Sequence, residues 1–245
     1  MIRHLLVIGA QRCGTTYLHT MLDSHEQVTM ARPANPEPKV FCSDEATRRG
    51  AEWYRETYFA HAGDELLLGE KSTSYLEDPK APARAKGMLG EIHVLVILRD
   101  PVKRAISNWR FSTDNGLETR SLETALSQNL AGPREWDPSR TSVSPFAYLE
   151  RGRYVDYLMP WMSTYPETSH VLFLEELLVD GCLPDELWTA LGVAPDLAPR
   201  DQDHAVNQSP GAPPVLSDEI LGTLRAYFAK SNRALSAHLG RGLPW

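Results

Sequence analysis

Residues 2–22 read IRHLLVIGAQRCGTTYLHTML and join an apolar run, a glycine-containing loop and a helical pattern. The apolar run at 5–8 ends at Gly9, which is typical of a buried parallel strand. Apolar residues then recur at helical spacing over 18–22. A helix that starts directly after such a loop presents backbone N–H groups and the positive end of its dipole, which favour an anion. The stretch therefore predicts a phosphate-binding loop between a strand and a helix.

The loop departs at one position from the nucleotide triphosphatase pattern G-x-x-x-x-G-K-[ST]. Gly9 and Gly14 keep the spacing, but Thr15 stands where that pattern has lysine. The cation comes earlier, at Arg12, and Thr16 adds a second hydroxyl. This arrangement favours a loop that binds a phosphate or sulfate ester over one that presents Lys and Mg²⁺ to a γ-phosphate. The alternative is an ordinary tight strand-to-helix turn.

Length and composition indicate one folded domain, which we expect to span residues 1–245. Hydrophobic residues make up 42% of the chain, enough for a full core. The net charge of −7 argues against nonspecific nucleic-acid binding but leaves room for a local basic site. The three cysteines, Cys13, Cys42 and Cys182, have neither the spacing of metal ligands nor that of a disulfide framework.

No targeting or membrane segment stands out in the sequence. The chain enters its first strand at once, so we expect no signal peptide. No apolar run approaches the ~18 residues that cross a bilayer. We therefore expect a soluble protein of the cytoplasm.

Apolar runs and helical patterns alternate along the rest of the chain. Further strands are predicted at 66–68, 92–98 and 171–174. Helices are predicted at 50–59, 78–87 with Pro79 near the first position, 101–112 with Asp100 as N-cap, 121–130, 146–165, 175–179, 183–191 and 217–239. Such alternation predicts an α/β fold with a central parallel sheet and helices on both faces.

Three polar segments interrupt this pattern. Residues 24–45 are rich in proline and are expected to form a loop that crosses the carboxyl edge of the sheet. Residues 194–214 are rich in Pro and Asp and are also expected to form a loop. Residues 114–144 are polar around one helical stretch, which indicates a lid or substrate loop.

A second anion site is suggested by Arg99 and Ser107. Arg99 follows the strongest strand, and Ser107 lies eight residues later in the next helix. In an open α/β sheet the ligand crevice lies outside the carboxyl ends of the strands, which is also the edge that holds Gly9. A guanidinium and a hydroxyl there can hold a phosphate. The alternative is a surface ion pair and a solvated serine, but together with the first loop they indicate a ligand with two phosphate-like groups.

Six segments resemble sulfotransferases that use 3′-phosphoadenosine-5′-phosphosulfate (PAPS), especially the bacterial and carbohydrate-type branch that includes heparan sulfate sulfotransferases. They are GAQRCGTTYL at 9–18, EPKVF at 37–41, GAEWYRETYF at 50–59, GEKSTSYL at 69–76, ILRDPVKRAISNW at 97–109 and ERGRY at 150–154. Their order and spacing agree with the family over most of the chain, and residues 227–245 resemble its terminal helix.

The resemblance assigns the two anion sites to the two ends of PAPS. The P-loop-like segment would bind the 5′-phosphosulfate through Gln11, Arg12, Cys13, Gly14, Thr15 and Thr16. Arg99 and Ser107 would bind the 3′-phosphate. No metal is implied, because a sulfuryl group carries less charge than a phosphoryl group.

The resemblance also implies three catalytic residues. Glu37 falls on the family's general base, which would take the proton of an acceptor hydroxyl. Lys71 and Arg12 would offset negative charge that develops around the transferred sulfuryl group. Without the resemblance, Glu37 could be a solvated loop residue, and Lys71 could form a surface ion pair with Glu70.

The sequence also departs from the heparan-type enzymes. Their C-terminal third carries a cysteine pair near the adenine, whereas residues 201–214 hold no cysteine. The net charge of −7 makes a long polyanionic acceptor less attractive. We therefore expect a small-molecule or carbohydrate acceptor, such as a secondary metabolite, a sugar hydroxyl or a glycolipid head.

Two other classes of protein remain open. A P-loop kinase or triphosphatase would need lysine at Thr15 and an acidic Mg²⁺ ligand at a strand end, where Arg99 stands instead. A nucleotide-binding protein without catalytic activity would not need Glu37, Lys71 and Arg12 together.

Overall fold

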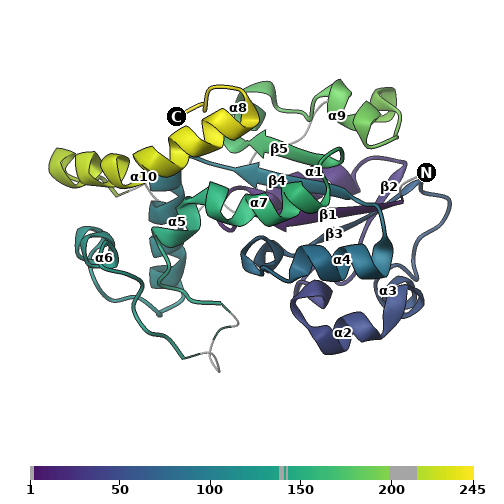
Figure 1. The fold of residues 1–245 in the computed structure, drawn as a ribbon, viewed down its shortest axis with the longest axis horizontal. Helices are drawn as coiled ribbons and strands as arrows, with labels where there is room; N and C mark the ends of the chain where they lie inside the picture. The colour runs from purple at the N-terminus through teal and green to yellow at the C-terminus, as the bar shows by residue number, and fades with distance from the viewer. Residues whose placement is uncertain (1–2, 138–140, 142, 199–213) are drawn as a thin grey trace. The chain divides into compact units, whose positions relative to one another are not determined.

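A central parallel sheet organises the computed structural model, which describes residues 3–137, 141, 143–198 and 214–245. Its five strands follow the order β2-β3-β1-β4-β5 (Figure 1). They are β1 His4–Gly9, β2 Val28–Met30, β3 Leu67–Lys71, β4 His93–Leu98 and β5 Ser169–Phe173. Each pair of neighbours is parallel, which confirms the predicted α/β fold.

Helices connect the strands and follow them along the chain. The α-helices of the described residues are α1 Thr15–Asp23, α2 Asp44–Arg48, α3 Gly50–Tyr58, α4 Ala81–Leu89, α5 Pro101–Asp114, α6 Leu122–Asn129, α7 Tyr154–Thr164, α8 Leu174–Asp180, α9 Asp185–Ala190 and α10 Asp218–Leu239. Short 3₁₀ helices are η1 Val40–Cys42, η2 Thr73–Glu77, η3 Glu150–Gly152 and η4 Pro195–Leu197.

The chain divides into two compact units. The first combines the described residues of 1–98 and 157–207 and contains the sheet with α1 to α4, α8 and α9. The second combines the described residues of 99–156 and 208–245 and contains α5, α6 and α10. The single domain expected for 1–245 stays a prediction.

The core of the first unit is built on β1 and β4. The side chains of Leu5 and Ile8 on β1 are fully buried, and every residue of β4 is buried. Buried on both faces, these strands show the continuous apolar sequence expected of parallel strands between layers. A backbone hydrogen bond of 2.9 Å from Ala10 N to Ile97 O fixes the start of the glycine loop against β4.

The second unit has its own apolar core, to which α5, α6 and α10 contribute. Its buried members are Val102, Ala105, Leu122, Ala125, Leu126, Phe146, Tyr148, Leu149, Leu216, Leu224 and Phe228. As predicted, Asp100 caps α5, because its Oδ1 accepts hydrogen bonds from Val102 N and Lys103 N. Gly152 allows close packing, since a Cβ there would lie 2.7 Å from the ring of Phe228.

The expectation that residues 24–45 form only a loop is wrong. Val28–Met30 form the edge strand β2, which pairs with residues 67–69 of β3. A strand of three residues carries too little alternation to be seen in the sequence, and its pairing with β3 defines it. The same segment also contains η1 and the start of α2.

Two helices begin three or more residues later than predicted. The helix expected at 78–87 begins at Ala81 with Pro82 in its first turn, instead of near Pro79. The helix expected at 146–165 begins at Tyr154, because residues 150–152 form the separate turn η3. In the loop expected at 194–214, residues 199–213 lie outside the described part of the chain.

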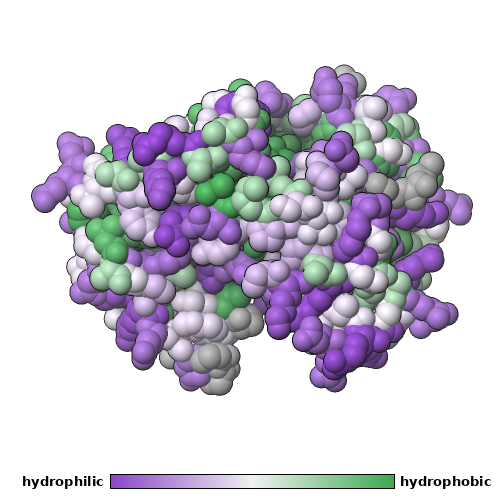
Figure 2. All heavy atoms as spheres, viewed as in Figure 1, coloured by the Kyte–Doolittle hydropathy of each residue, from purple (hydrophilic) through white to green (hydrophobic). Residues whose placement is uncertain are grey.

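Polar residues dominate the surface in view. Figure 2 shows a mostly hydrophilic face with hydrophobic residues in small, scattered groups. Large apolar side chains that are exposed are Phe111, Leu130, Met159, Leu178, Val179 and Val215. Among the described helices, none has the length and apolar character needed to cross a membrane.

Candidate active site

The loop between β1 and α1 has a backbone conformation that suits the binding of an anion. Gly14 precedes α1 with a φ of 86°, and a Cβ there would lie 2.7 Å from Leu174 Cδ1. The left-handed backbone therefore favours glycine, and a larger residue would have to displace the end of the Leu174 side chain. α1 has no side-chain N-cap hydrogen bond and no acidic residue in its first turn. Its first N–H groups and its dipole thus favour a negatively charged ligand.

The loop side chains occupy different environments. Arg12 is partly exposed and has a positive φ of 67°. Cys13 is fully buried and its Sγ lies 3.8 Å from the carbonyl oxygen of Gln11, so it packs inside the loop. Thr15 is buried and Thr16 partly exposed at the start of α1. The role of each in binding PAPS stays a prediction.

Glu37 and Lys71 meet, although 34 residues separate them in the sequence. Lys71 Nζ donates a hydrogen bond of 2.7 Å to Glu37 Oε1. Thr73 donates to Glu37 Oε2 from its backbone N and from its Oγ1, both at 3.0 Å. The side chains of Lys71 and Glu37 are only 12% and 16% exposed. These contacts hold the Glu37 carboxyl group in place, so it is not a solvated loop residue.

Strand pairing places this ion pair beside the glycine loop. Lys71 is the last residue of β3, and it pairs with Val7 of β1. β1 ends at Gly9, where the loop begins. Since both strands are parallel, their carboxyl ends lie next to each other at one edge of the sheet. The first unit thus brings the predicted base, the predicted lysine and the predicted anion loop to the same edge.

Glu70 does not pair with Lys71, so the alternative of a surface ion pair between them is wrong. Consecutive strand residues point to opposite faces, and Glu70 points into the core, where it is fully buried. Its carboxylate accepts hydrogen bonds from Tyr54 OH at 2.7 Å and from Ser72 Oγ at 2.5 Å. Burial raises the pKa of Glu70, although these hydrogen bonds oppose the shift.

Ser72 and Tyr75, whose hydroxyl groups both contact Glu70, also hold the segment that carries Glu37. Ser72 Oγ accepts a hydrogen bond of 2.9 Å from Lys39 N, and Tyr75 OH accepts one of 3.3 Å from Phe41 N. A buried network centred on Glu70 therefore fixes the backbone just after Glu37. The sequence interpretation missed this network, although an acidic residue inside a buried strand is a signal that it needs partners.

Arg99 and Ser107 belong to the second unit. Arg99 directly follows β4, and its carbonyl oxygen accepts a hydrogen bond of 2.7 Å from Tyr154 OH. Ser107 lies in the second turn of α5, and both side chains are partly exposed. Their assignment to a 3′-phosphate stays a prediction. Across the described residues, no three His, Cys, Asp or Glu side chains gather in a way that could hold a metal ion.

Comparisons with known proteins agree with this architecture. The family model described as "Sulfotransferase domain" matches residues 3–177. The heparan sulfate glucosamine 3-O-sulfotransferase 3B1 of Mus musculus is 26% identical over 264 residues, which cover 98% of this chain and 64% of that protein. The bifunctional heparan sulfate N-deacetylase/N-sulfotransferase 3 of Homo sapiens is 28% identical over 202 residues, which cover 78% of this chain and 22% of that protein.

A solved structure shows the same fold. The crystal structure of a sulfotransferase from Alicyclobacillus acidocaldarius has a TM-score of 0.75 and 22% identity, and the match covers 99% of this chain and 98% of that one. The chain spans slightly less than two thirds of the first curated relative. The family model covers well over half of the chain, from β1 into α8, and includes the glycine loop, Glu37, Lys71, Arg99 and Ser107. The resemblance seen in the sequence is thereby confirmed, and the chain belongs to the sulfotransferase domain family.

Proposed function

We propose that this protein transfers a sulfuryl group from PAPS to a hydroxyl of a small-molecule or carbohydrate acceptor, with Glu37 as the general base. The observation that carries the proposal is the Glu37–Lys71 pair at 2.7 Å, located next to the glycine loop at the carboxyl edge of β1 and β3. A base, a cation and an anion-binding loop at one sheet edge are the components that such a transfer requires.

The loop fits the phosphosulfate end of PAPS. The first turn of α1 offers backbone N–H groups without an acidic side chain beside them. Arg12 adds a cation within the same loop. Bound there, PAPS supplies the activated sulfuryl group. Arg99 and Ser107 would hold its 3′-phosphate through a charge-assisted hydrogen bond and a hydroxyl.

Glu37 and Lys71 have complementary parts in the proposed reaction. Glu37 takes the proton of the acceptor hydroxyl while the acceptor oxygen bonds to sulfur and the bond from sulfur to the 5′-phosphate oxygen breaks, with 3′-phosphoadenosine-5′-phosphate as the leaving group. Lys71 donates one N–H to Glu37, and its ammonium group has two more to offer to sulfuryl oxygens. Thr73 keeps the carboxylate oriented through its backbone N and hydroxyl. These contacts hold Glu37 in one position, as a positioned base requires.

The acceptor is the least constrained part of the proposal. The curated relatives described above act, by their names, on heparan sulfate. The net charge of −7 disfavours a long polyanion. We therefore propose a small acceptor that carries a hydroxyl, such as a sugar, a glycolipid head or a secondary metabolite. The segment 114–144 is proposed to contact it.

Transfer of radioactive sulfur from labelled PAPS to a panel of small acceptors tests the function directly. Turnover with at least one hydroxyl acceptor, lost in Glu37→Gln, supports the proposal. Binding of the desulfated nucleotide without transfer to any acceptor would favour a nucleotide-binding protein without catalysis. Turnover that EDTA abolishes and Mg²⁺ restores would revive the kinase alternative, which Thr15 at the lysine position disfavours.

A further inference from the structure

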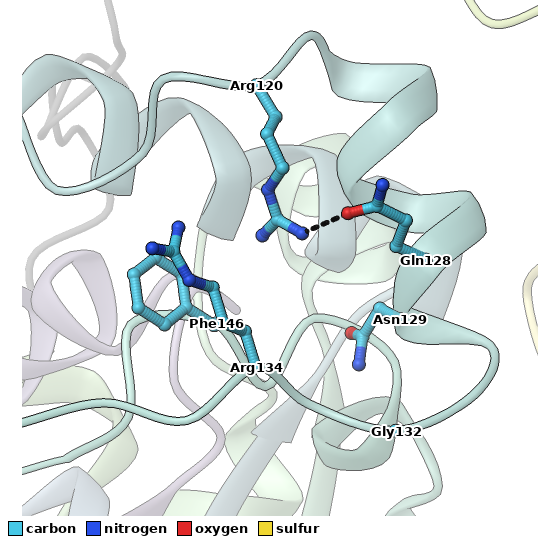
Figure 3. Close-up of a pocket in the computed structure, with 6 residues that line it drawn as sticks. All are labelled: Arg120, Gln128, Asn129, Gly132, Arg134 and Phe146. Carbon is cyan, nitrogen blue, oxygen red and sulfur yellow. Dashed lines mark hydrogen bonds between the residues drawn. The ribbon is translucent and has the colours of Figure 1, made fainter.

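The second unit contains a cavity outside the residues that we assign to PAPS binding and to proton transfer. Its volume is about 320 Å³, and Figure 3 shows its lining. The lining residues are Arg120, Gln128, Asn129, Gly132, Arg134 and Phe146. All but Phe146 belong to the segment 114–144, in which the sequence indicates a lid or substrate loop. The volume is at the lower end of the range for small-molecule sites, about 300–1,000 Å³.

Arg120 is held rigidly at one side of this cavity. Its Nε and Nη2 donate to the two carboxylate oxygens of Glu118 at 3.0 and 2.6 Å. Burial alone would raise the pKa of Glu118, but hydrogen bonds from Arg120 and Tyr148 outweigh it and lower the pKa to about 2. Glu118 is therefore ionised at neutral pH. It fixes the guanidinium in a planar, two-point contact.

Arg134 faces the same aromatic ring as Arg120. Its guanidinium carbon lies 5.1 Å from the centroid of Phe146, and that of Arg120 lies 6.0 Å from it. Arg134 is exposed, and within the described residues this ring is the partner found for its guanidinium. Glu118 balances the charge of Arg120 but not that of Arg134. Among the residues that the structure describes, the cavity thus has two guanidinium groups, and that of Arg134 has no carboxylate partner.

The amide side chains of the lining already have their partners. Asn129 donates to Glu150 at 2.9 Å and accepts from Leu149 N at 2.9 Å. Gln128 Oε1 accepts a hydrogen bond of 2.7 Å from Arg120 Nη1 (Figure 3). A guanidinium has five N–H donors, of which Arg120 uses three in these contacts. Donors therefore outnumber acceptors around the cavity, which suits a ligand that only accepts hydrogen bonds.

We propose that this cavity binds an oxyanion of a small ligand, either a carboxylate or a sulfate or phosphate ester, between Arg120 and Arg134. The ring of Phe146 supports the ligand from one side, and both guanidinium groups donate to its oxygens. Binding of such an oxyanion can be tested without the transfer reaction. If the bound ligand is the acceptor of the transfer, that assignment rests on the proposed function.

Titration calorimetry at low ionic strength tests the site on the full chain, with sodium glucuronate and sodium sulfate as probes and sodium chloride as reference. Arg134→Gln removes a positive charge from an exposed position, so folding should be unaffected. We expect it to weaken binding of at least one probe about tenfold, the effect of one charge-assisted hydrogen bond. Arg134→Lys should restore part of that affinity.

Arg225→Gln is the matched control, because it removes the same charge from an exposed position on α10. It should leave binding unchanged. If Arg134→Gln weakens the binding of glucuronate, the site takes a carboxylate. If it weakens the binding of sulfate, the site takes a sulfate ester. Equal affinities for both probes in Arg134→Gln and the unmodified protein would overturn the proposal.

The glycine loop is a second place where sulfate can bind, and a crystal soak with selenate separates the two. Selenate mimics sulfate and can be located by its anomalous scattering. Density between Arg120 and Arg134, retained in Arg12→Gln, supports the cavity site whether or not the loop binds PAPS. Selenate at the loop alone, together with glucuronate binding that does not depend on Arg134, would refute the cavity site and leave the proposed function intact.

Discussion

Lys71 Nζ lies 2.7 Å from Oε1 of Glu37, and both side chains are less than one fifth exposed. Exposed ion pairs contribute little because water screens them, whereas a pair removed from water interacts more strongly. The contact also crosses from the end of β3 to the segment after β2. It therefore fixes the position of a loop carboxylate relative to the sheet edge, which is what a general base needs.

Replacing Lys71 should impair chemistry more than nucleotide binding. Lys71→Met keeps much of the side-chain length but removes the charge that we assign to sulfuryl oxygens. We expect kcat to fall by about 10²–10³-fold, the typical effect of removing one donor that stabilises developing charge. Steady-state kinetics with PAPS and an acceptor measure this, with the exposed Lys80→Met as control. An unchanged kcat in Lys71→Met would remove Lys71 from the catalytic set.

The buried network of Glu70 should contribute to stability. In Glu70→Gln, one carboxylate oxygen becomes an amide that cannot accept the hydroxyl proton of Tyr54 or Ser72. Such a mismatch costs about 1–3 kcal/mol in the free energy of unfolding, as measured in urea. Hydrogen exchange should also accelerate at the amides of Lys39 and Phe41, whose acceptors belong to the network.

The matched control for Glu70→Gln is Glu52→Gln, an exposed change of the same type on α3. It should leave the free energy of unfolding unchanged. If both variants are as stable as the unmodified protein, the network does not hold the segment after Glu37.

Glu118 should make stability depend on acid pH. Its pKa is lowered from 4.5 to about 2, against the effect of burial, by hydrogen bonds from Arg120 and Tyr148. The folded state therefore binds the proton less readily than the unfolded state. The resulting stabilisation is fully present above pH 4.5 and is lost as pH falls towards 2. Its upper bound is about 3 kcal/mol, given 1.36 kcal/mol per pKa unit.

Urea unfolding of Glu118→Gln at several pH values checks whether the charge of Glu118 stabilises the folded state. The stability deficit of the variant should be largest at neutral pH and shrink as the pH falls towards about 2. A deficit that stays constant over this range would show that Glu118 acts through packing and not through its charge.

Arg99 should distinguish nucleotides by their 3′-phosphate. Arg99→Ala should weaken binding of 3′-phosphoadenosine-5′-phosphate by about 2–3 kcal/mol, the scale of a lost charge-assisted hydrogen bond. Binding of adenosine 5′-phosphate should change little. Calorimetry with both nucleotides gives the comparison. If the unmodified protein binds the two equally, the 3′-phosphate assignment of Arg99 and Ser107 is wrong.

Much of the fold could be predicted because its signals are local. The strand near 5–8 is a continuous apolar run, that near 92–98 is apolar except for His93, and the start of α5 is set by Asp100 and Pro101 within a few residues. β2 could not be predicted, because pairing with β3 defines its three residues. An edge strand this short depends on tertiary contacts more than on its own sequence.

The candidate site, like the fold, could be predicted only in part from local sequence patterns. The glycine loop is a local pattern, and Arg99 and Ser107 were indicated by their positions after the strongest strand, whereas the roles of Glu37 and Lys71 came from the family resemblance. That Lys71 binds Glu37 and not the adjacent Glu70 depends on which face of β3 meets the core, and this is decided by Tyr54 and Ser72. No local pattern links Arg120 to Arg134 either, since Phe146 joins them only after folding.

Glu37→Gln is the most direct test of the proposed chemistry. The substitution keeps the shape of the side chain and removes its basicity. A positioned base typically contributes ~10²–10⁴-fold, so we expect kcat to fall by that factor. Affinity for the nucleotide should change little, because a base contacts the acceptor and not the phosphates. Single-turnover transfer and nucleotide calorimetry on the same preparation separate the two effects.

Arg12→Ala provides the contrast for Glu37→Gln. It lies in the loop that we assign to the phosphosulfate, so it should weaken nucleotide binding and also reduce turnover. Glu37→Gln with a near-normal kcat on the natural acceptor would mean that Glu37 is not the base. The Glu37–Lys71 pair would then serve to position Lys71. The base would have to be another carboxylate or histidine, and the segment 114–144 is the first place to look for it.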